Sequence, residues 1–189
     1  MPMLGLLPGT GKMDERNIVL IGFMGTGKSV VGKKLASFLK RDFIDTDAVI
    51  VEREKERIPR IFQIKGENYF RDIESQVIQE ISNKKRCVIA TGGGSVIRKE
   101  NFKALKKNAI VICLTAEPAI VLLRTSSVDD RPLLLKSKDA IATIRYLMKE
   151  REPYYAKADY TINTSELSPD DTVKAILDII AKEEKHAGN

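Results

Sequence analysis

One glycine-rich segment, Gly22-Phe23-Met24-Gly25-Thr26-Gly27-Lys28-Ser29, constrains this chain more than any other stretch. It follows the apolar run Ile18-Val19-Leu20-Ile21, which is typical of a buried strand, and precedes a run with helical periodicity. In that context the spacing G-x-x-x-x-G-K-S indicates a phosphate-binding loop. Its glycines let successive backbone N–H groups point at a polyphosphate, and the next helix adds the positive end of its dipole. The sequence therefore predicts a nucleoside triphosphate site.

The residues of this loop have distinct expected roles. Lys28 is expected to reach the β- and γ-phosphates as a point charge, and the Ser29 hydroxyl to ligate the Mg²⁺ that bridges them. A second Gly-Thr-Gly-Lys at positions 9–12 has no preceding strand and no following hydroxyl residue, so we interpret it as a coincidence. The expected nucleotide-binding residues here are Gly25, Thr26, Gly27, Lys28, Ser29 and Val30.

Length and composition favour one ordinary globular domain. The chain has 189 residues, of which 43% are hydrophobic and 31% charged, and no apolar run approaches the roughly 20 residues that cross a bilayer. Cys87 and Cys113 lie inside expected buried strands, which favours core thiols and a reducing compartment. The net charge of +6 permits a nucleic-acid partner but equally suits anionic substrates. We expect a cytoplasmic monomer that binds neither nucleic acid nor membranes.

The chain divides into a leader, a domain and an inserted lid. Residues 1–13 hold three methionines, two prolines and three glycines, so we expect a disordered leader, with Met13 as a candidate start. Residues 14–189 are expected to form a single domain. Within it, periodicity is lost at about 125–138, around Arg131-Pro132-Leu133-Leu134, as in a mobile lid.

The order of the predicted elements indicates an α/β fold. Strands alternating with helices imply a three-layer sandwich with a five-stranded parallel sheet, whose sites lie at the carboxyl ends of the strands. Gly66 is expected to separate two helices, and Pro153 to end the helix that begins at Asp139. The last helix is expected to run from the Ser168-Pro169 cap to about Lys182. The expected strands cover 18–21, 43–44, 87–91, 109–114 and 159–162.

Two polar segments follow predicted strands. Asp45 and Asp47 are two residues apart, so one can hold Mg²⁺ and the other can hydrogen-bond an acceptor hydroxyl, even as its base. The alternative is that Asp47 only caps the next helix. Gly92-Gly93-Gly94 suits close approach of a ligand to the backbone, although glycines also mark simple turns.

Several charged residues have both a functional and a structural interpretation. Arg71 and Glu74 are at helical spacing i, i+3, and form either part of the site or a surface pair. Arg131 either closes over the phosphates and stabilises transition-state charge or is an exposed residue before a proline. Arg151 either contributes to the site or complements a helix dipole.

These segments together resemble the shikimate kinase family, from Arg16 to about Ile180. The phosphate loop matches, and so do five shorter motifs, which include the family's D-x-D, F-R-x-x-E and G-G-G. The matching segments are Asp45-Thr46-Asp47, Phe70-Arg71-Asp72-Ile73-Glu74, Gly92-Gly93-Gly94, Arg131-Pro132-Leu133-Leu134 and Arg151-Glu152-Pro153-Tyr154-Tyr155.

The resemblance implies a P-loop fold related to the nucleoside monophosphate kinases, and a known reaction. That reaction is the ATP-dependent phosphorylation of the 3-hydroxyl of shikimate, a step towards chorismate and the aromatic amino acids. Mg²⁺ is the implied metal, held by Ser29 with the support of Asp45. ATP and shikimate are the implied small-molecule partners.

The resemblance also assigns roles to single residues. Asp47 would bind the shikimate hydroxyls and help activate the 3-hydroxyl, while Arg71 and Arg151 would hold the carboxylate. Arg131 would move in with the lid against ATP, and Arg124 would lie near the adenine. The implied acceptor-binding set is Asp47, Arg71, Glu74, Gly92, Gly93, Gly94 and Arg151, and the implied catalytic set is Lys28, Asp47 and Arg131.

Three other interpretations remain open at this point. A gluconate-type kinase would share the loop and lid, but the D-x-D, F-R-x-x-E and G-G-G motifs argue against it. A nucleoside monophosphate kinase would need a base-recognition pocket, of which the sequence gives no sign. A basic nucleotide-binding protein without catalysis is the third, although the lysines form no dense run and no aromatic residues are interleaved with them.

Overall fold

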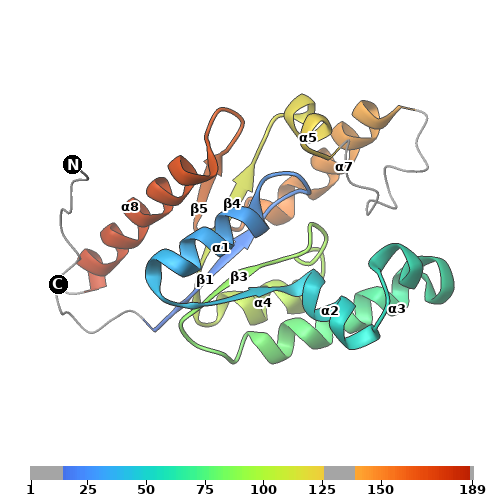
Figure 1. Ribbon diagram of the computed structural model, residues 1–189, viewed down its shortest axis with the longest axis horizontal. Coiled ribbons are helices and arrows are strands. Elements are labelled where there is room, and N and C mark those ends of the chain that lie inside the picture. The colour runs from blue at the N-terminus through green and yellow to red at the C-terminus, as the bar shows by residue number, and fades with distance from the viewer. Residues whose placement is uncertain (1–14, 126–138, 188–189) are drawn as a thin grey trace.

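A computed structural model describes residues 15–125 and 139–187 of the chain. Five strands form one all-parallel sheet in the order β2-β3-β1-β4-β5 (Figure 1). Parallel neighbours need crossover connections, and helices supply them here. The predicted α/β fold with a five-stranded parallel sheet is confirmed. The strands are β1 (Asn17–Ile21), β2 (Asp42–Asp45), β3 (Cys87–Ala90), β4 (Ala109–Thr115) and β5 (Tyr160–Asn163).

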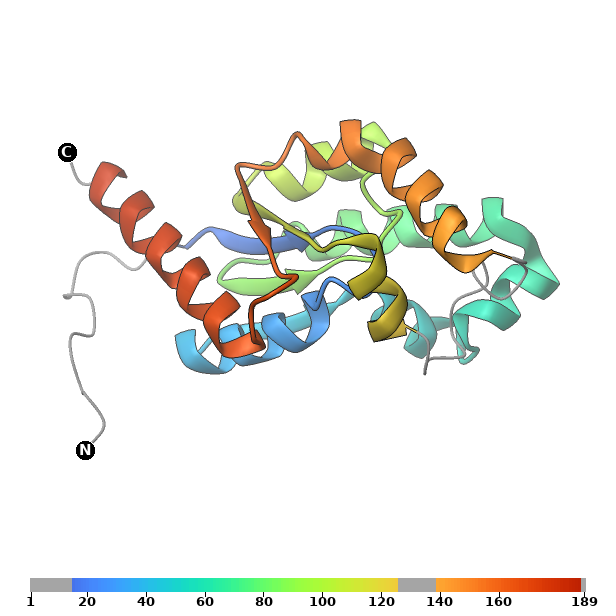
Figure 2. The ribbon, with the colours of Figure 1, turned by 90° about the horizontal axis from the view of Figure 1, so that it is seen from above.

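Helices cover both faces of the sheet, with α1 and α8 on one side and α4 and α7 on the other (Figure 2). Ile18 and Leu20 of β1 belong to the apolar layer with α1 and α8, while Val19 and Ile21 belong to the opposite layer. This alternation follows from the two-residue period of a strand. The helices are α1 (Lys28–Leu39), α2 (Thr46–Glu54), α3 (Ile58–Ile81), α4 (Lys99–Lys106), α5 (Pro118–Thr125), α7 (Ala140–Tyr155) and α8 (Pro169–Ala187).

Two helix ends differ from the sequence expectation. Pro153 does not end α7, because the Ala156 N–H donates to the Glu152 carbonyl at 2.9 Å and closes one more turn. Arg151 and Tyr155 are therefore one helical turn apart on the same face. The last helix also runs beyond Lys182, where Glu183 accepts hydrogen bonds from Arg16 and Tyr160.

Other features of the chain agree with expectation or lie outside the described residues. Gly66 has φ 82° and divides α3 into two helical parts, as predicted. Cys87 and Cys113 are buried free thiols, and burial raises the pKa of Cys113 to about 11. No helix in the described ranges has the length and apolar character needed to span a bilayer. The expected leader, the expected lid and Arg131 fall outside 15–125 and 139–187.

Candidate active site

The glycine-rich loop between β1 and α1 has a backbone that only glycine adopts easily. Gly22, Gly25 and Gly27 have φ values of 134°, 74° and 95°. A Cβ on Gly22 would also lie 2.1 Å from the carbonyl oxygen of Leu114, which no side chain can accommodate. The loop is therefore held tightly against β4, and helix α1 begins directly after it at Lys28.

Lys28 lies inside this loop. Its side chain is buried, and Nζ donates to the carbonyl oxygens of Gly22 and Phe23 at 2.8 and 2.7 Å. The Thr26 hydroxyl donates to the same Phe23 carbonyl at 2.8 Å. The ammonium group is thus held within the loop by backbone carbonyls, and its contact with a phosphate stays a prediction.

Asp45 connects β2, α2 and the phosphate loop. The Ser29 hydroxyl donates to Asp45 Oδ2 at 2.6 Å, and Asp45 Oδ1 accepts from the backbone N–H groups of Asp47 and Ala48 at 3.0 and 3.4 Å. Asp45 is thus the N-cap of α2, so the interpretation of Asp47 as the cap is wrong. Ser29 and Asp45 are thus in contact, and their role as metal ligands stays a prediction.

A cleft of about 370 Å³ lies at the carboxyl edge of the sheet. It receives the phosphate loop after β1, both aspartates near the end of β2, and Gly93 beyond β3. The sequence expectation that these strand ends meet at one site is therefore confirmed. The cleft is lined by Met24, Gly25, Thr26, Gly27, Lys28, Ser29, Val30, Val31, Asp45, Asp47, Thr91, Gly93, Arg124, Thr164, Leu167, Pro169 and Thr172.

Arg124 links the loop to the segment after β5. Its guanidinium donates to the Thr164 carbonyl at 2.7 Å, to the Thr164 hydroxyl at 3.1 Å and to the Gly25 carbonyl at 3.4 Å. The Thr164 hydroxyl lies within hydrogen-bond distance of the carbonyls of Thr26 and Thr115. Sequence reasoning did not single out the Thr164 side chain, because a threonine after a strand carries no distinctive signal.

A buried charged network lies beside this cleft. Arg71 Nη1 donates to Glu74 Oε2 at 2.8 Å, and the Ser95 hydroxyl donates to Glu74 Oε1 at 2.7 Å. Glu74 is only 1% exposed, so its two partners compensate the cost of burying the carboxylate. Burial lowers the pKa of Arg71, but the carboxylates of Glu74 and Glu67 outweigh burial, so the pKa is raised overall. The surface-pair interpretation of Arg71 and Glu74 is thereby excluded.

None of the three consecutive glycines has a positive φ, so these positions need glycine for its lack of a side chain. A Cβ on Gly92 would lie 2.6 Å from Asp47 Oδ1 and 3.1 Å from Glu74 Oε1. The segment is also a turn, closed by a bond from the Ser95 N–H to the Gly92 carbonyl at 3.1 Å. The segment is therefore a turn with the carboxylates of Asp47 and Glu74 gathered around Gly92, and the close approach of a ligand to its backbone stays a prediction.

The Thr46 side chain anchors this turn to α2. Its hydroxyl is buried and accepts from the Gly92 N–H at 2.9 Å. Thr46 and Ser95 were both missed by sequence reasoning, although Thr46 stands between two predicted site residues. The position of Thr46 within the Asp45-Thr46-Asp47 motif was the signal that could have found it.

Arg151 is a second arginine that contacts the glycine turn. Its Nη1 donates to the Gly93 carbonyl at 3.2 Å, and its guanidinium carbon lies 5.3 Å from the centroid of the Phe23 ring. The side chain is buried and joins the glycine turn to the phosphate loop. Arg151 therefore does more than complement a helix dipole, and its contact with an acceptor stays a prediction.

Gly94→Ala should displace Arg71, because a Cβ there would lie 2.7 Å from both terminal guanidinium nitrogens. The expected result is a rise of about tenfold or more in the KM for an anionic acceptor, from loss of a charge-assisted contact. The KM for ATP should stay unchanged. Steady-state kinetics with each substrate varied in turn measures both values, and an unchanged acceptor KM would contradict the placement of Arg71.

The fold and cleft together define a small P-loop kinase, with a phosphate loop in the cleft and a group of carboxylate and arginine side chains around the neighbouring glycine turn. The family model for shikimate kinase matches residues 24–181. The chain therefore belongs to the shikimate kinase family, and the predicted enzyme class is confirmed.

Known relatives agree with this assignment. The shikimate kinase of Thermodesulfovibrio yellowstonii is 46% identical over 162 residues, which cover 86% of this chain and 93% of the relative. The structure of the Acinetobacter baumannii shikimate kinase in complex with shikimate is 38% identical, with a TM-score of 0.86, and covers 89% of this chain and 94% of that one. The Aquifex aeolicus shikimate kinase is 36% identical, with a TM-score of 0.75, and covers 92% of this chain and 99% of that one.

Proposed function

We propose that this protein transfers the γ-phosphoryl group of ATP to the 3-hydroxyl of shikimate, which gives shikimate 3-phosphate and ADP. The observation that carries the proposal is the convergence of the phosphate loop, Asp47, the half-buried Arg71 and the buried Arg151 around the Gly92–Gly94 turn. A small carboxylate-bearing polyol needs guanidinium donors for its carboxylate and carboxylate acceptors for its hydroxyls.

The nucleotide half of the cleft is proposed to hold ATP through the loop backbone. Lys28 lies in the loop and would exchange its contacts to the Gly22 and Phe23 carbonyls for the β- and γ-phosphates. Arg124, tethered to Thr164 at the rim of the same cleft, is placed to flank the adenine. Arg131 remains a proposed contact to ATP from the lid.

Asp47 is proposed to bind the acceptor hydroxyl and accept its proton. Asp47 lines the cleft together with Lys28, and its carboxylate lies beside Gly92, as that of the buried Glu74 does. A base within hydrogen-bond reach of the attacking hydroxyl increases its nucleophilicity as the phosphoryl group is transferred. Arg71 and Arg151 would orient the acceptor by its carboxylate, which places the hydroxyl for in-line attack.

Ser29 and Asp45 are proposed to hold Mg²⁺. A hydroxyl and a carboxylate oxygen are the hard ligands that this ion prefers, and they lie 2.6 Å apart. Held there, Mg²⁺ would supply positive charge to neutralise the negative charge that develops during phosphoryl transfer. The described parts of the chain contain no cluster of three or more His, Cys, Asp or Glu side chains suited to a metal ion, which fits an ion carried mainly by the nucleotide.

We also propose a cellular compartment and an oligomeric state for the enzyme. Cys87 and Cys113 are free thiols, which suits a reducing cytoplasm. We also propose that the enzyme acts as a monomer.

The proposal is tested by ADP release in the presence of ATP and Mg²⁺. Shikimate, gluconate, quinate, a nucleoside monophosphate and no acceptor are compared under identical conditions. ADP release that depends on shikimate is the expected result. Faster release with gluconate or the monophosphate would reassign the acceptor, while salt-dependent binding to nucleic acid without turnover would favour the non-catalytic alternative.

A further inference from the structure

The Gly93 carbonyl accepts two hydrogen bonds from one helix. The Tyr155 hydroxyl donates to this oxygen at 2.5 Å, and Arg151 Nη1 donates to it at 3.2 Å. Both donors lie on the last turn of α7, one helical turn apart, because α7 continues through Pro153. The oxygen belongs to the glycine turn that lines the catalytic cleft.

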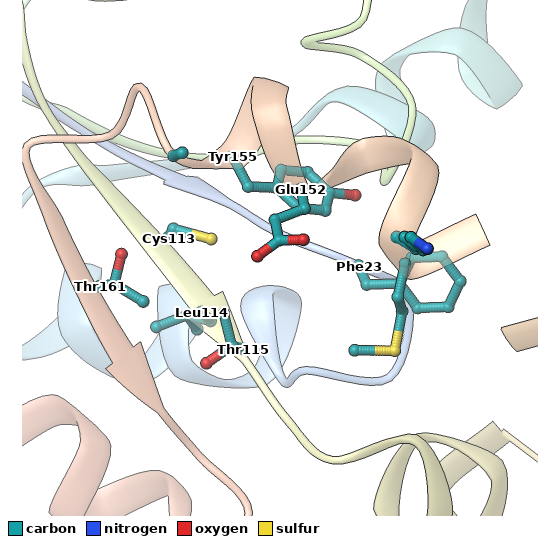
Figure 3. Close-up of a pocket in the computed structure, with 10 residues that line it drawn as sticks. Phe23, Cys113, Leu114, Thr115, Glu152, Tyr155 and Thr161 are labelled. Atoms are coloured by element: carbon teal, nitrogen blue, oxygen red, sulfur yellow. The ribbon is translucent and has the colours of Figure 1, made fainter. Parts of the chain in front are cut away.

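Tyr155 reaches this carbonyl from the wall of a second cavity. The cavity has a volume of about 490 Å³ and lies between α7 and the strands β4 and β5 (Figure 3). The tyrosine ring, Cys113 and Phe23 form part of its lining. Burial raises the pKa of Tyr155 to about 12, and the Arg151 guanidinium opposes this rise only in part. The hydroxyl is therefore protonated at neutral pH and available as a donor.

We propose that Tyr155 is a positioning residue that fixes the Gly93 peptide, and with it Arg151, for the acceptor. A peptide group is planar, so a fixed Gly93 oxygen also fixes the direction of the Gly94 N–H. Glycine has no side chain to restrain its own backbone, and an external donor supplies the restraint. The inference rests on the proposed function, since it concerns how the shikimate half of the site is held.

Packing holds the Tyr155 ring but does not orient the Gly93 peptide. The ring belongs to the buried apolar core and lines the cavity on one side, and apolar contacts of this kind are non-directional. The hydrogen bond to Gly93 is the directional contact that fixes the carbonyl oxygen. Without it, Arg151 is the remaining side-chain donor to that oxygen among the described residues, and its guanidinium is the group needed for the acceptor carboxylate.

Tyr155→Phe removes the hydroxyl and keeps the ring. We expect the KM for shikimate to rise about three- to tenfold, the effect of one lost hydrogen bond, while kcat stays within about twofold. The KM for ATP should not change. Tyr154→Phe is the matched control, because Tyr154 is the adjacent tyrosine and contacts Lys157 through its ring. This control should leave every parameter at the wild-type value.

The outcomes separate the inference from the proposed function. If wild-type enzyme does not phosphorylate shikimate, the proposed function fails. If it does, and Tyr155→Phe has wild-type KM values, the positioning role is wrong. A purely structural role would lower kcat through loss of active enzyme and leave both KM values unchanged, which also overturns the inference. Calorimetric titration of shikimate, with melting temperatures for each variant, checks that the KM change reports binding by folded protein.

Discussion

Lys28→Met is expected to lower kcat with shikimate by at least about 1,000-fold, because the phosphoryl group loses the charge that stabilises its transfer. Methionine keeps the apolar stem of the buried side chain and removes only the ammonium group that contacts the Gly22 and Phe23 carbonyls. The measurement is single-turnover transfer from labelled ATP, which separates chemistry from product release.

Lys34→Met is the matched control for this substitution. Lys34 lies on the same helix but is exposed, where it pairs with Asp170 at 2.8 Å. A surface pair of this kind contributes little to stability, so turnover and melting temperature should stay near wild type. Near-wild-type turnover in Lys28→Met would contradict the account of the phosphate loop.

Asp47→Asn is expected to lower kcat by about 100- to 10,000-fold, the range for loss of a general base. Asparagine has the same shape and can still hydrogen-bond a hydroxyl, so the KM for shikimate should change far less than kcat. ATP affinity should also persist, since the phosphate loop and the Ser29–Asp45 contact are untouched. Steady-state kinetics and nucleotide titration measure the three quantities.

Asp42→Asn provides the comparison for Asp47. Asp42 is an exposed carboxylate at the start of β2, whereas Asp47 lies on α2 just after the end of that strand, so the substitution removes the same charge away from the cleft. It should leave kcat unchanged. A similar fall in both variants would show that net charge, and not a base at Asp47, governs the rate.

Much of the fold and the nucleotide half of the site could be predicted from the sequence. The phosphate loop has a fixed spacing because its backbone geometry is fixed, and Gly22, Gly25 and Gly27 all prove to have positive φ. Asp45 and Asp47 could be placed because parallel strands end at one edge of the sheet. Local chemistry and periodicity were sufficient in these cases.

The contacts between segments far apart in the chain could not be predicted in this way. The bonds of Tyr155 to Gly93 and of Ser95 to Glu74 depend on how α7, α3 and the glycine turn pack together. The continuation of α7 through Pro153 also follows from a final turn closed by Ala156, which overrides the usual effect of proline. Tertiary packing decided each of these features.

The side chains around the glycine turn illustrate the difference between features set by local sequence and features set by tertiary packing. A pattern of Arg71 and Glu74 at i, i+3 fits a surface pair and a site equally well, and only the burial of Glu74 separates the two. The motif resemblance supplied the correct family where the residues alone left alternatives open. Residue roles in the pocket remain predictions that the substitutions above address.

The central claim is tested most directly by the identity of the product. The enzyme is incubated with ATP, Mg²⁺ and shikimate, and the organic product is examined by proton–phosphorus correlated NMR. The account predicts a single phosphate monoester whose phosphorus couples to the proton on C3 of shikimate, with an equal amount of ADP. Inorganic phosphate without an ester, or an ester at another hydroxyl, would contradict the proposed placement of the acceptor against Asp47, Arg71 and Arg151.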